Sequence, residues 1–146
     1  MREIKFRAWD EVSKQMGAVK GFQFGDDGLI STDIWLHDEV KNAKYWVTRA
    51  FPVVMQYSGL KDKNGKEIYE GDFLIDDDSE PCRHRIVWME DKARWELETL
   101  MDESGAWDYG EFPLEDQISY ETGKENMLDS FEIIGNIYEN PELLKV

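Results

Sequence analysis

The 146-residue chain contains one cysteine and no long hydrophobic run. A disulfide needs two cysteines, so Cys82 has no partner within the chain, which is typical of a protein from a reducing compartment. The amino-terminal residues MREIKFRAWDE do not show the apolar run of a secretion signal, and nowhere do roughly 20 apolar residues follow one another as a membrane span requires. We therefore expect a cytoplasmic protein that does not enter a membrane.

Metal-binding motifs are also missing. A closed zinc site normally takes four ligands from cysteine and histidine, and this chain offers only three: His37, Cys82 and His84. The acids Asp76, Asp78 and Glu80 have the alternate spacing that begins a calcium loop. However, Pro81 stands where that loop needs a glycine, and Val87 stands where it needs a glutamate. We therefore expect no metal site, and we interpret residues 76–80 as a solvated loop.

Catalytic motifs are incomplete as well. Ser58 and Ser104 each precede a glycine, but the rest of the nucleophile motif Gly-x-Ser-x-Gly is absent. A phosphate-binding loop would need a glycine at Leu60 and a hydroxyl residue at Glu67. The 32 acidic residues do not single out a pair for acid and base catalysis. We therefore expect a protein that is not an enzyme, with no catalytic residue and no cofactor.

Negative charge is abundant, but only in one part of the chain. Residues 1–56 hold 8 basic and 8 acidic residues, whereas residues 57–146 hold 9 basic and 24 acidic residues, which accounts for the whole net charge of −15. Such a surface repels phosphate backbones and lacks the basic patch of a nucleic-acid-binding protein. We expect a neutral amino-terminal segment, 1–56, and an acidic region, 57–146, with no direct binding of nucleic acid.

The pattern of apolar residues predicts a β-rich amino-terminal segment. Ile4, Phe6 and Ala8 alternate with polar neighbours, which is the period of a half-buried strand. Residues 15–24 indicate a second strand, ended by the turn residues 25–28. Residues 33–47 fit a short helix about as well as a strand followed by a loop, so both alternatives stay open.

A hairpin is the clearest signal in the acidic region. The apolar residues 53–57 precede Asn64 and Gly65, a pair that favours the two positive φ angles of a type I′ turn. Gly71 and Asp72 then interrupt the pattern, as a bulge or a bend at a barrel corner does.

Further strands are predicted toward the carboxy terminus. Residues 83–89 and 94–99 form a second hairpin, residues 131–138 form a final strand, and residues 139–144 form a helical turn. Residues 101–126 are predicted to form a long acidic excursion with a helical turn at 114–118. Short strands joined by tight turns predict a mainly β, β-rich α+β fold, with an SH3-like small barrel in the carboxy-terminal part, an amino-terminal β-rich segment and a minor helix.

Three blocks of this sequence resemble the YopX family: residues 4–10 (IKFRAWD), residues 56–72 (QYSGLKDKNGKEIYEGD) and residues 134–143 (IGNIYENPEL). The resemblance implies a phage or prophage protein of the host cytoplasm, an SH3-like barrel and homo-oligomers. It implies no activity, because the family has no established one. The residues that carry the resemblance are expected to be structural: Tyr57, Gly59, Asp62, Asn64, Gly65, Tyr69, Gly71, Asp72, Gly135, Asn136 and Tyr138.

Aromatic residues offer a candidate partner surface. The six tryptophans are expected to lie mostly in the core, although aromatic residues are also enriched at interfaces. Trp107 differs from the others because it lies between Gly105 and Gly110 in an acidic stretch. We therefore assign Trp107, with Tyr109, to a candidate partner surface.

Several functions remain open on these observations. The first is a non-enzymatic accessory protein that self-associates and binds a host or phage protein. The second is an acidic DNA mimic that inhibits a host nucleic-acid-binding protein, because residues 90–132 hold 14 acidic and 3 basic residues. A surface that serves only solubility and an unrecognised enzyme are the remaining alternatives.

Overall fold

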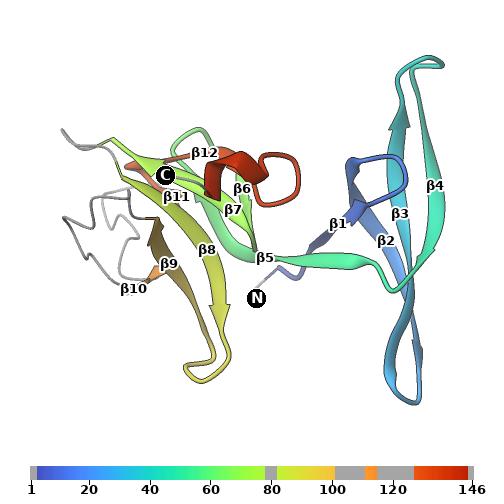
Figure 1. Cartoon of the computed structure of the whole chain (residues 1–146), viewed down its shortest axis with the longest axis horizontal. Helices are drawn as coiled ribbons and strands as arrows, with labels where there is room; N and C mark the ends of the chain where they lie inside the picture. Colours follow the sequence, from blue (N-terminus) through green and yellow to red (C-terminus); the bar gives the residue numbers. More distant parts are fainter. Residues whose placement is uncertain (1–2, 78–81, 101–110, 115–126, 145–146) are drawn as a thin grey trace. The chain divides into compact units, whose positions relative to one another are not determined.

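The computed structural model describes residues 3–77, 82–100, 111–114 and 127–144. The protein is mainly β, with one sheet of seven strands and one of five (Figure 1). Within the described residues no α-helix occurs, and the minor helix predicted from the sequence is limited to a 3-10 helix, η2 (Pro141–Leu144). The chain divides into a unit of residues 3–56 and a unit of residues 57–146, called here the amino-terminal and carboxy-terminal units.

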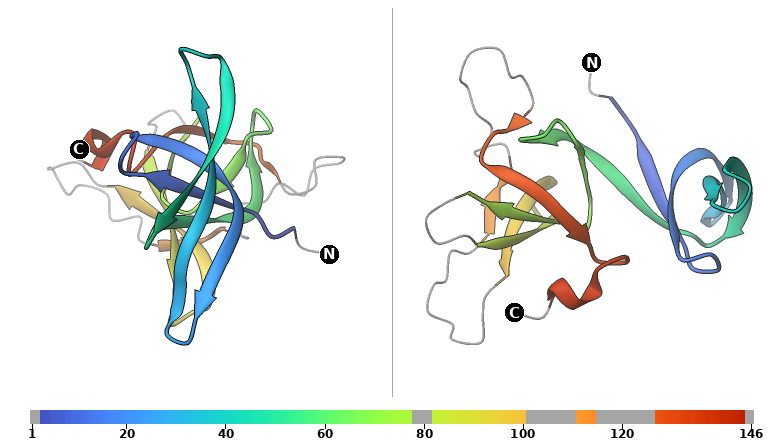
Figure 2. Two further views of the ribbon diagram at one scale, coloured as in Figure 1. Left: turned by 90° about the vertical axis from the view of Figure 1, so that its right-hand side faces the viewer. Right: turned by 90° about the horizontal axis from the view of Figure 1, so that it is seen from above.

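The amino-terminal unit is an antiparallel sheet. β1 pairs with β2 on one side and with the first residues of β5 on the other, and β3 and β4 continue the sheet beyond β2. Figure 2 shows β2, β3 and β4 as long, strongly twisted neighbours. The bounds are β1 (Phe6–Asp10), β2 (Gln15–Gly25), β3 (Gly28–Asp38), β4 (Ala43–Ala50) and β5 (Val53–Asp62).

Strands occupy the segment that the sequence left open. Residues 33–38 belong to β3 and residues 43–47 to β4, with a turn between them, so the helix alternative is wrong. Ile34 and Leu36 are buried while Trp35 and His37 between them are exposed, which is the alternation of a strand with one covered face. The pattern was ambiguous because the exposed face also carries large apolar side chains.

The first strand begins later than the sequence indicated. Ile4 precedes β1 and is 70% exposed, so its predicted place on the core face is wrong. Ala8, Trp9 and Asp10 are all buried, so both faces of β1 are covered at these residues. Alternation alone could not reveal this, since a strand covered on both faces loses its polar side.

The core of the amino-terminal unit is small. Ala8, Ile34 and Leu36 are its buried members, with Val19, Val47 and Val54 packed around them. Gly17 permits this packing, because a Cβ atom at that position would lie 2.3 Å from the backbone oxygen of Trp35.

A buried ion pair accompanies this core. Arg49 donates hydrogen bonds from Nε and Nη2 to the two carboxylate oxygens of Asp10, which is fully buried. The hydroxyl and backbone N–H of Ser13 donate to the same carboxylate, at 2.6 and 3.0 Å. The hydrogen bond from Arg49 and those from Ser13 hold the pKa of Asp10 far below its usual range, although burial opposes them.

The carboxy-terminal unit has two layers. Its five-stranded sheet has the order β10-β9-β8-β7-β12, and the second part of β5 pairs with β6 antiparallel and with β11 parallel. Within the described residues these pairings leave the sheet open, so the predicted closed barrel is not observed there. The bounds are β6 (Glu67–Tyr69), β7 (Asp72–Asp76), β8 (Arg83–Met89), β9 (Arg94–Leu100), β10 (Glu111–Pro113), β11 (Met127–Leu128) and β12 (Phe131–Asn136).

Sequence and structure agree on most elements of this unit. The two hairpins correspond to β5–β6 and β8–β9, and the helical turn near the carboxy terminus is η2. The final strand ends at Asn136, two residues earlier than expected. The acidic excursion and the helical turn expected at 114–118 lie largely outside the described residues.

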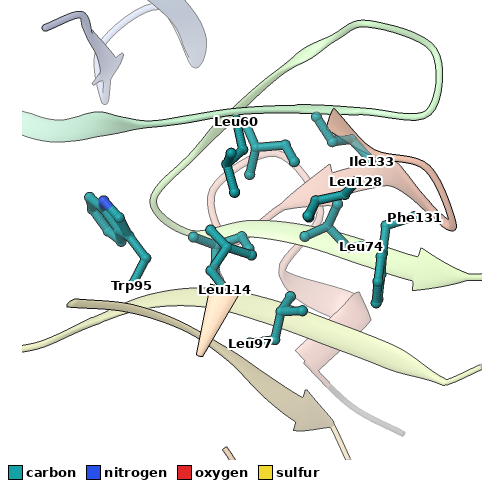
Figure 3. Close-up of a cluster of buried hydrophobic side chains, with 10 residues drawn as sticks. Leu60, Leu74, Trp95, Leu97, Leu114, Leu128, Phe131 and Ile133 are labelled. Atoms are coloured by element: carbon teal, nitrogen blue, oxygen red, sulfur yellow. The ribbon is translucent and has the colours of Figure 1, made fainter. Parts of the chain in front are cut away.

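Apolar side chains from both layers form the larger core of the molecule (Figure 3). Leu60 and Leu128, from the layer of β5, β6 and β11, face Leu74 and Leu97 of the five-stranded sheet. All ten members are buried: Leu60, Ile68, Leu74, Ile86, Trp95, Leu97, Leu114, Leu128, Phe131 and Ile133. This unit therefore holds most of the apolar burial that drives folding.

Candidate functional site

The residues that carry the family resemblance hold turns and strand junctions. Asp62 is almost fully buried, and its carboxylate accepts hydrogen bonds from the backbone N–H groups of Asn64, Lys66 and Ile133, at 2.9, 2.9 and 3.1 Å. One side chain thus closes the β5–β6 turn and ties it to β12. These contacts of Asp62 hold the fold.

The turn itself differs from the predicted type I′. Gly65 has a positive φ of 80°, but Asn64 does not. The N–H of Gly65 donates to the carbonyl of Asp62, and the N–H of Asp62 donates to the carbonyl of Lys66, which leaves a three-residue loop. This is the type I turn followed by a left-handed glycine that commonly joins strands across three residues. The Asp62 carboxylate favours it by capping the loop.

Asp72 and Gly71 hold the next junction. The carboxylate of Asp72 accepts the N–H of Tyr69 at 2.8 Å, and Gly71 has a φ of 77°. The backbone of Gly71 bonds to Ile86 on one side and to Ile137 on the other. The rings of Tyr57 and Tyr69 pack together with centroids 5.5 Å apart. Together these contacts join the β6–β7 turn to β8 and to the chain after β12.

The last block of the resemblance caps the chain after β12. The side-chain oxygen of Asn136 accepts the N–H groups of Tyr138 and Glu139, both at 3.0 Å. Gly135 leaves room for Asn140, whose side-chain oxygen would lie 2.5 Å from a Cβ atom there. Gly59, with a φ of 95°, lies within β5 at its register shift. These motif residues therefore make contacts that hold the carboxy-terminal unit together.

One buried polar network could be mistaken for a catalytic triad. His84 contacts the carboxylate of Asp76 through Nε2 at 3.0 Å and the hydroxyl of Thr99 through Nδ1 at 3.2 Å. The ring is 6% exposed and packs edge-on against Phe131. Asp76 also accepts the backbone N–H of Cys82 at 3.0 Å. Because the imidazole lies inside the core, we assign it the role of joining β7, β8 and β9.

Metal ligands do not converge in the described part of the chain. No group of three or more histidine, cysteine, aspartate or glutamate side chains there could hold an ion. The two candidates for a partner surface, Trp107 and Tyr109, lie outside the described residues, as do Asp78, Glu80 and much of the acidic stretch 90–132.

Three of the tryptophans in the described residues are exposed, against expectation. Trp9 and Trp95 are buried, but Trp35, Trp46 and Trp88 are 38%, 50% and 39% exposed. An indole buries much of its large apolar surface in an ordinary fold, so exposed ones need a reason. Two of these three lie side by side on the amino-terminal unit.

The outward face of β3 and β4 carries this pair. Trp35 and Trp46 are direct cross-strand partners, and they lie on the side of the sheet opposite Ile34 and Leu36. The ammonium group of Lys20, from β2, lies 5.4 Å from the ring centroid of Trp35 and 4.4 Å from that of Trp46. Both distances are within the range of cation–π attraction.

A second pair on the same face extends its positive charge. His37 and Lys44 are cross-strand partners next to the tryptophans, and both are exposed. The name tryptophan face is used below for Lys20, Trp35, His37, Lys44 and Trp46. Neither lysine of this face has a carboxylate partner among the described residues. Asp33 lies beside the face, but its carboxylate accepts the hydroxyl of Thr48 at 2.5 Å.

Other basic residues of the amino-terminal unit are already paired. Lys5, Lys14, Lys41 and Arg49 each contact a carboxylate. The two lysines of the tryptophan face differ from these residues, because neither contacts a carboxylate among the described residues. A surface with two indoles and two unpaired cations favours a ligand that is apolar and anionic.

Four basic residues of the carboxy-terminal unit form ion pairs within that unit. Arg85 contacts Glu98 at 2.5 Å, and Lys63 contacts Glu132 at 3.0 Å. Lys92 and Arg94 both contact the buried carboxylate of Glu96. Burial would raise the pKa of Glu96, but these two cations outweigh it and lower the pKa. The acidic excess of this unit therefore stays unneutralised at its surface.

The single helix among the described residues is far too short to cross a membrane.

Sequence reasoning missed the tryptophan face because the ambiguity of residues 33–47 hid it. Once those residues are taken as two paired strands, the alternation of exposed and buried positions places both indoles on one side. The signal that could have found the site was the match of Trp35 with Trp46 across a turn at residues 39–42.

These features define a mainly β protein of two units, with a structural signature in one unit and an exposed aromatic face in the other. The YopX family model, described as YopX protein, matches residues 5–145, so the chain belongs to the YopX family. The crystal structure of protein EF1440 from Enterococcus faecalis is similar, with a TM-score of 0.62 and 27% sequence identity over 99% of this chain and 100% of that chain. No curated protein matches.

Proposed function

We propose that this YopX family protein is a non-enzymatic accessory protein of a phage or prophage that self-associates and binds protein partners in the host cytoplasm. The observation that carries this proposal is the tryptophan face. Aromatic residues supply large contact areas at interfaces, and an exposed pair on paired strands offers such an area.

Position in the sheet supports the same proposal. β4 is the last strand in the order of its sheet among the described residues, and most of its residues are exposed. An edge strand presents unpaired N–H and carbonyl groups that another chain can use. The neutral charge of residues 1–56 lets two copies approach through this unit without repulsion.

A binding role also fits the chemistry better than catalysis. Asp10, Asp62, Asp76 and Glu96 make hydrogen bonds or ion pairs that hold the fold. The titratable groups of the interior are thus engaged in structure, whereas catalytic groups are usually positioned toward a cleft. The proposed role depends on surfaces alone.

Self-association tests the proposal on the unmodified protein. Light scattering at several concentrations is expected to give a mass above that of the 17.2 kDa monomer, rising with concentration. Sodium chloride titration is the companion measurement, because a contact with charged groups weakens when they are screened. A monomer mass throughout a wide range of concentrations would refute self-association.

A further inference from the structure

The hairpin of β8 and β9 carries the chemical complement of the tryptophan face. Its turn holds Glu90 and Asp91, which are both exposed. Trp88, two residues before Glu90, is 39% exposed and packs edge-on against Trp95 with ring centroids 5.0 Å apart. The name acidic tip is used below for Trp88, Glu90 and Asp91.

Charges at this tip are unpaired, like those of the tryptophan face. No basic side chain contacts Glu90 or Asp91 among the described residues. The neighbouring cations are engaged elsewhere, since Lys92 and Arg94 contact the buried Glu96. Figure 1 shows the turn of this hairpin projecting beyond the rest of its own sheet. The two carboxylates are therefore exposed next to an accessible indole.

We propose that the acidic tip of one copy docks on the tryptophan face of a second copy. Two carboxylates would then meet the two ammonium groups, those of Lys20 and Lys44, and the indole of Trp88 would pack on the indoles of the face. Charge complementarity favours this occupant. Two lysines without an ion pair lie beside exposed indoles on one unit, and two carboxylates without an ion pair lie near the exposed Trp88 on the other.

Such a contact joins two different surfaces of the same chain. Contacts of this kind form a reciprocal pair, a closed ring or an open filament, depending on the rotation between copies. This inference rests on the self-association proposed above and names the surfaces that make it. It adds a direction to that association, from the carboxy-terminal unit of one copy to the amino-terminal unit of the next.

Charge reversal tests the contact. The face variant carries Lys20→Glu and Lys44→Glu, the tip variant carries Glu90→Lys and Asp91→Lys, and circular dichroism verifies that each is folded. Each variant alone is expected to weaken self-association by about tenfold or more, because like charges then face each other. The matched control is Lys14→Glu, which reverses one exposed charge in the turn after β1.

Mixing the two variants separates a direct contact from a general effect of charge. The face variant and the tip variant are expected to bind each other, because reversed carboxylates then meet reversed lysines. A chain that carries all four substitutions is expected to regain self-association. Sedimentation velocity of the mixture and of the fourfold variant measures both results.

Each outcome decides one of the two proposals. If the unmodified protein is monomeric, the proposed self-association fails, whatever the variants do. If the unmodified protein associates and the two variants associate equally well, or fail to bind each other, this contact is wrong while self-association stands.

Discussion

The two units of this protein differ in how many aromatic residues they leave exposed. The carboxy-terminal unit buries Trp95 and Phe131 in a cluster of ten residues and exposes Trp88, whereas the amino-terminal unit has a buried cluster of three residues and exposes Trp35, Trp46 and two phenylalanines. Apolar burial is the main favourable term in folding. The difference indicates that one unit supplies most of the stability and the other presents most of the aromatic surface.

Charge follows the same division. In the carboxy-terminal unit Lys63, Arg85, Lys92 and Arg94 all contact carboxylates of that unit. In the amino-terminal unit the unpaired lysines lie beside the exposed indoles. Cations within the acidic unit thus serve the fold, and the pair on the tryptophan face is available to a partner.

The largest effect is expected in the carboxy-terminal core. Leu74 is fully buried between the two layers, and Leu74→Ala is expected to lower the free energy of unfolding by about 2 to 5 kcal/mol, as buried leucines do when a cavity remains. Urea unfolding followed by tryptophan fluorescence measures this change. Val40→Ala, at an exposed turn position, is the matched control and should change stability very little. Equal effects of the two substitutions would contradict the assigned core.

The ion pair of Asp10 and Arg49 is the corresponding test in the amino-terminal unit. Asp10→Asn is expected to cost about 3 kcal/mol at neutral pH, because the Arg49 guanidinium loses its buried carboxylate. The pKa of Asp10 is lower in the folded protein, so its stabilisation is full above the unfolded pKa and decreases as pH falls toward the folded pKa. The difference between wild type and variant should therefore shrink below about pH 4. A difference that stays constant down to pH 2 would argue against this pairing.

Asp62 tests whether the family signature is structural. Asp62→Ala leaves the N–H groups of Asn64, Lys66 and Ile133 without their acceptor, and is expected to cost about 2 kcal/mol. Asp62→Asn keeps one acceptor oxygen and should retain part of the stability. Thermal unfolding checks the order of the three proteins. If both variants melted like the wild type, Asp62 would have to be considered again as a functional residue.

The smallest of these effects is expected at the β5–β6 turn. Gly65→Val places a β-branched residue at a φ of 80° and is expected to cost about 1 to 2 kcal/mol. Gly65→Asn is the control, because asparagine tolerates the left-handed region better. Differential scanning calorimetry should show a lower melting temperature for valine than for asparagine. An unchanged melting temperature for Gly65→Val would refute the turn assignment.

Much of the fold could be predicted from local patterns. The two hairpins around Gly65 and around residues 90–93 follow from turn residues between apolar runs, and the structure confirms both. The type of the first turn could not be predicted from Asn64 and Gly65 alone, because Asp62, outside the pair, caps the loop with its carboxylate. The burial of Trp9 could not be predicted from alternation either, because its neighbours Ala8 and Asp10, on the other side of β1, are buried as well.

The candidate site was less predictable than the fold. Tryptophans in sequence are usually a sign of core, and nothing near Trp35 or Trp46 distinguishes them from Trp95. Their exposure results from tertiary packing, which covers the face of Ile34 with Ala8 and apolar neighbours while the indoles lie on the other face. The positive charge of Lys20, which is 15 residues from Trp35 and 26 from Trp46 along the chain, reaches the pair from β2. The contact between Lys20 and the two indoles therefore depends on the pairing register of β2, β3 and β4.

Removing the exposed indoles tests most directly whether the amino-terminal unit is the recognition surface. Sedimentation velocity and urea unfolding would compare the wild type with the double variant Trp35→Ser and Trp46→Ser. Phe24→Ser with Phe51→Ser is the control, since both phenylalanines are exposed apart from the tryptophan face. The double tryptophan variant should be monomeric at concentrations where wild type and control associate, with its unfolding free energy within about 1 kcal/mol of wild type. Undiminished association of that variant, or a large loss of its stability, would contradict the assignment of this face to binding.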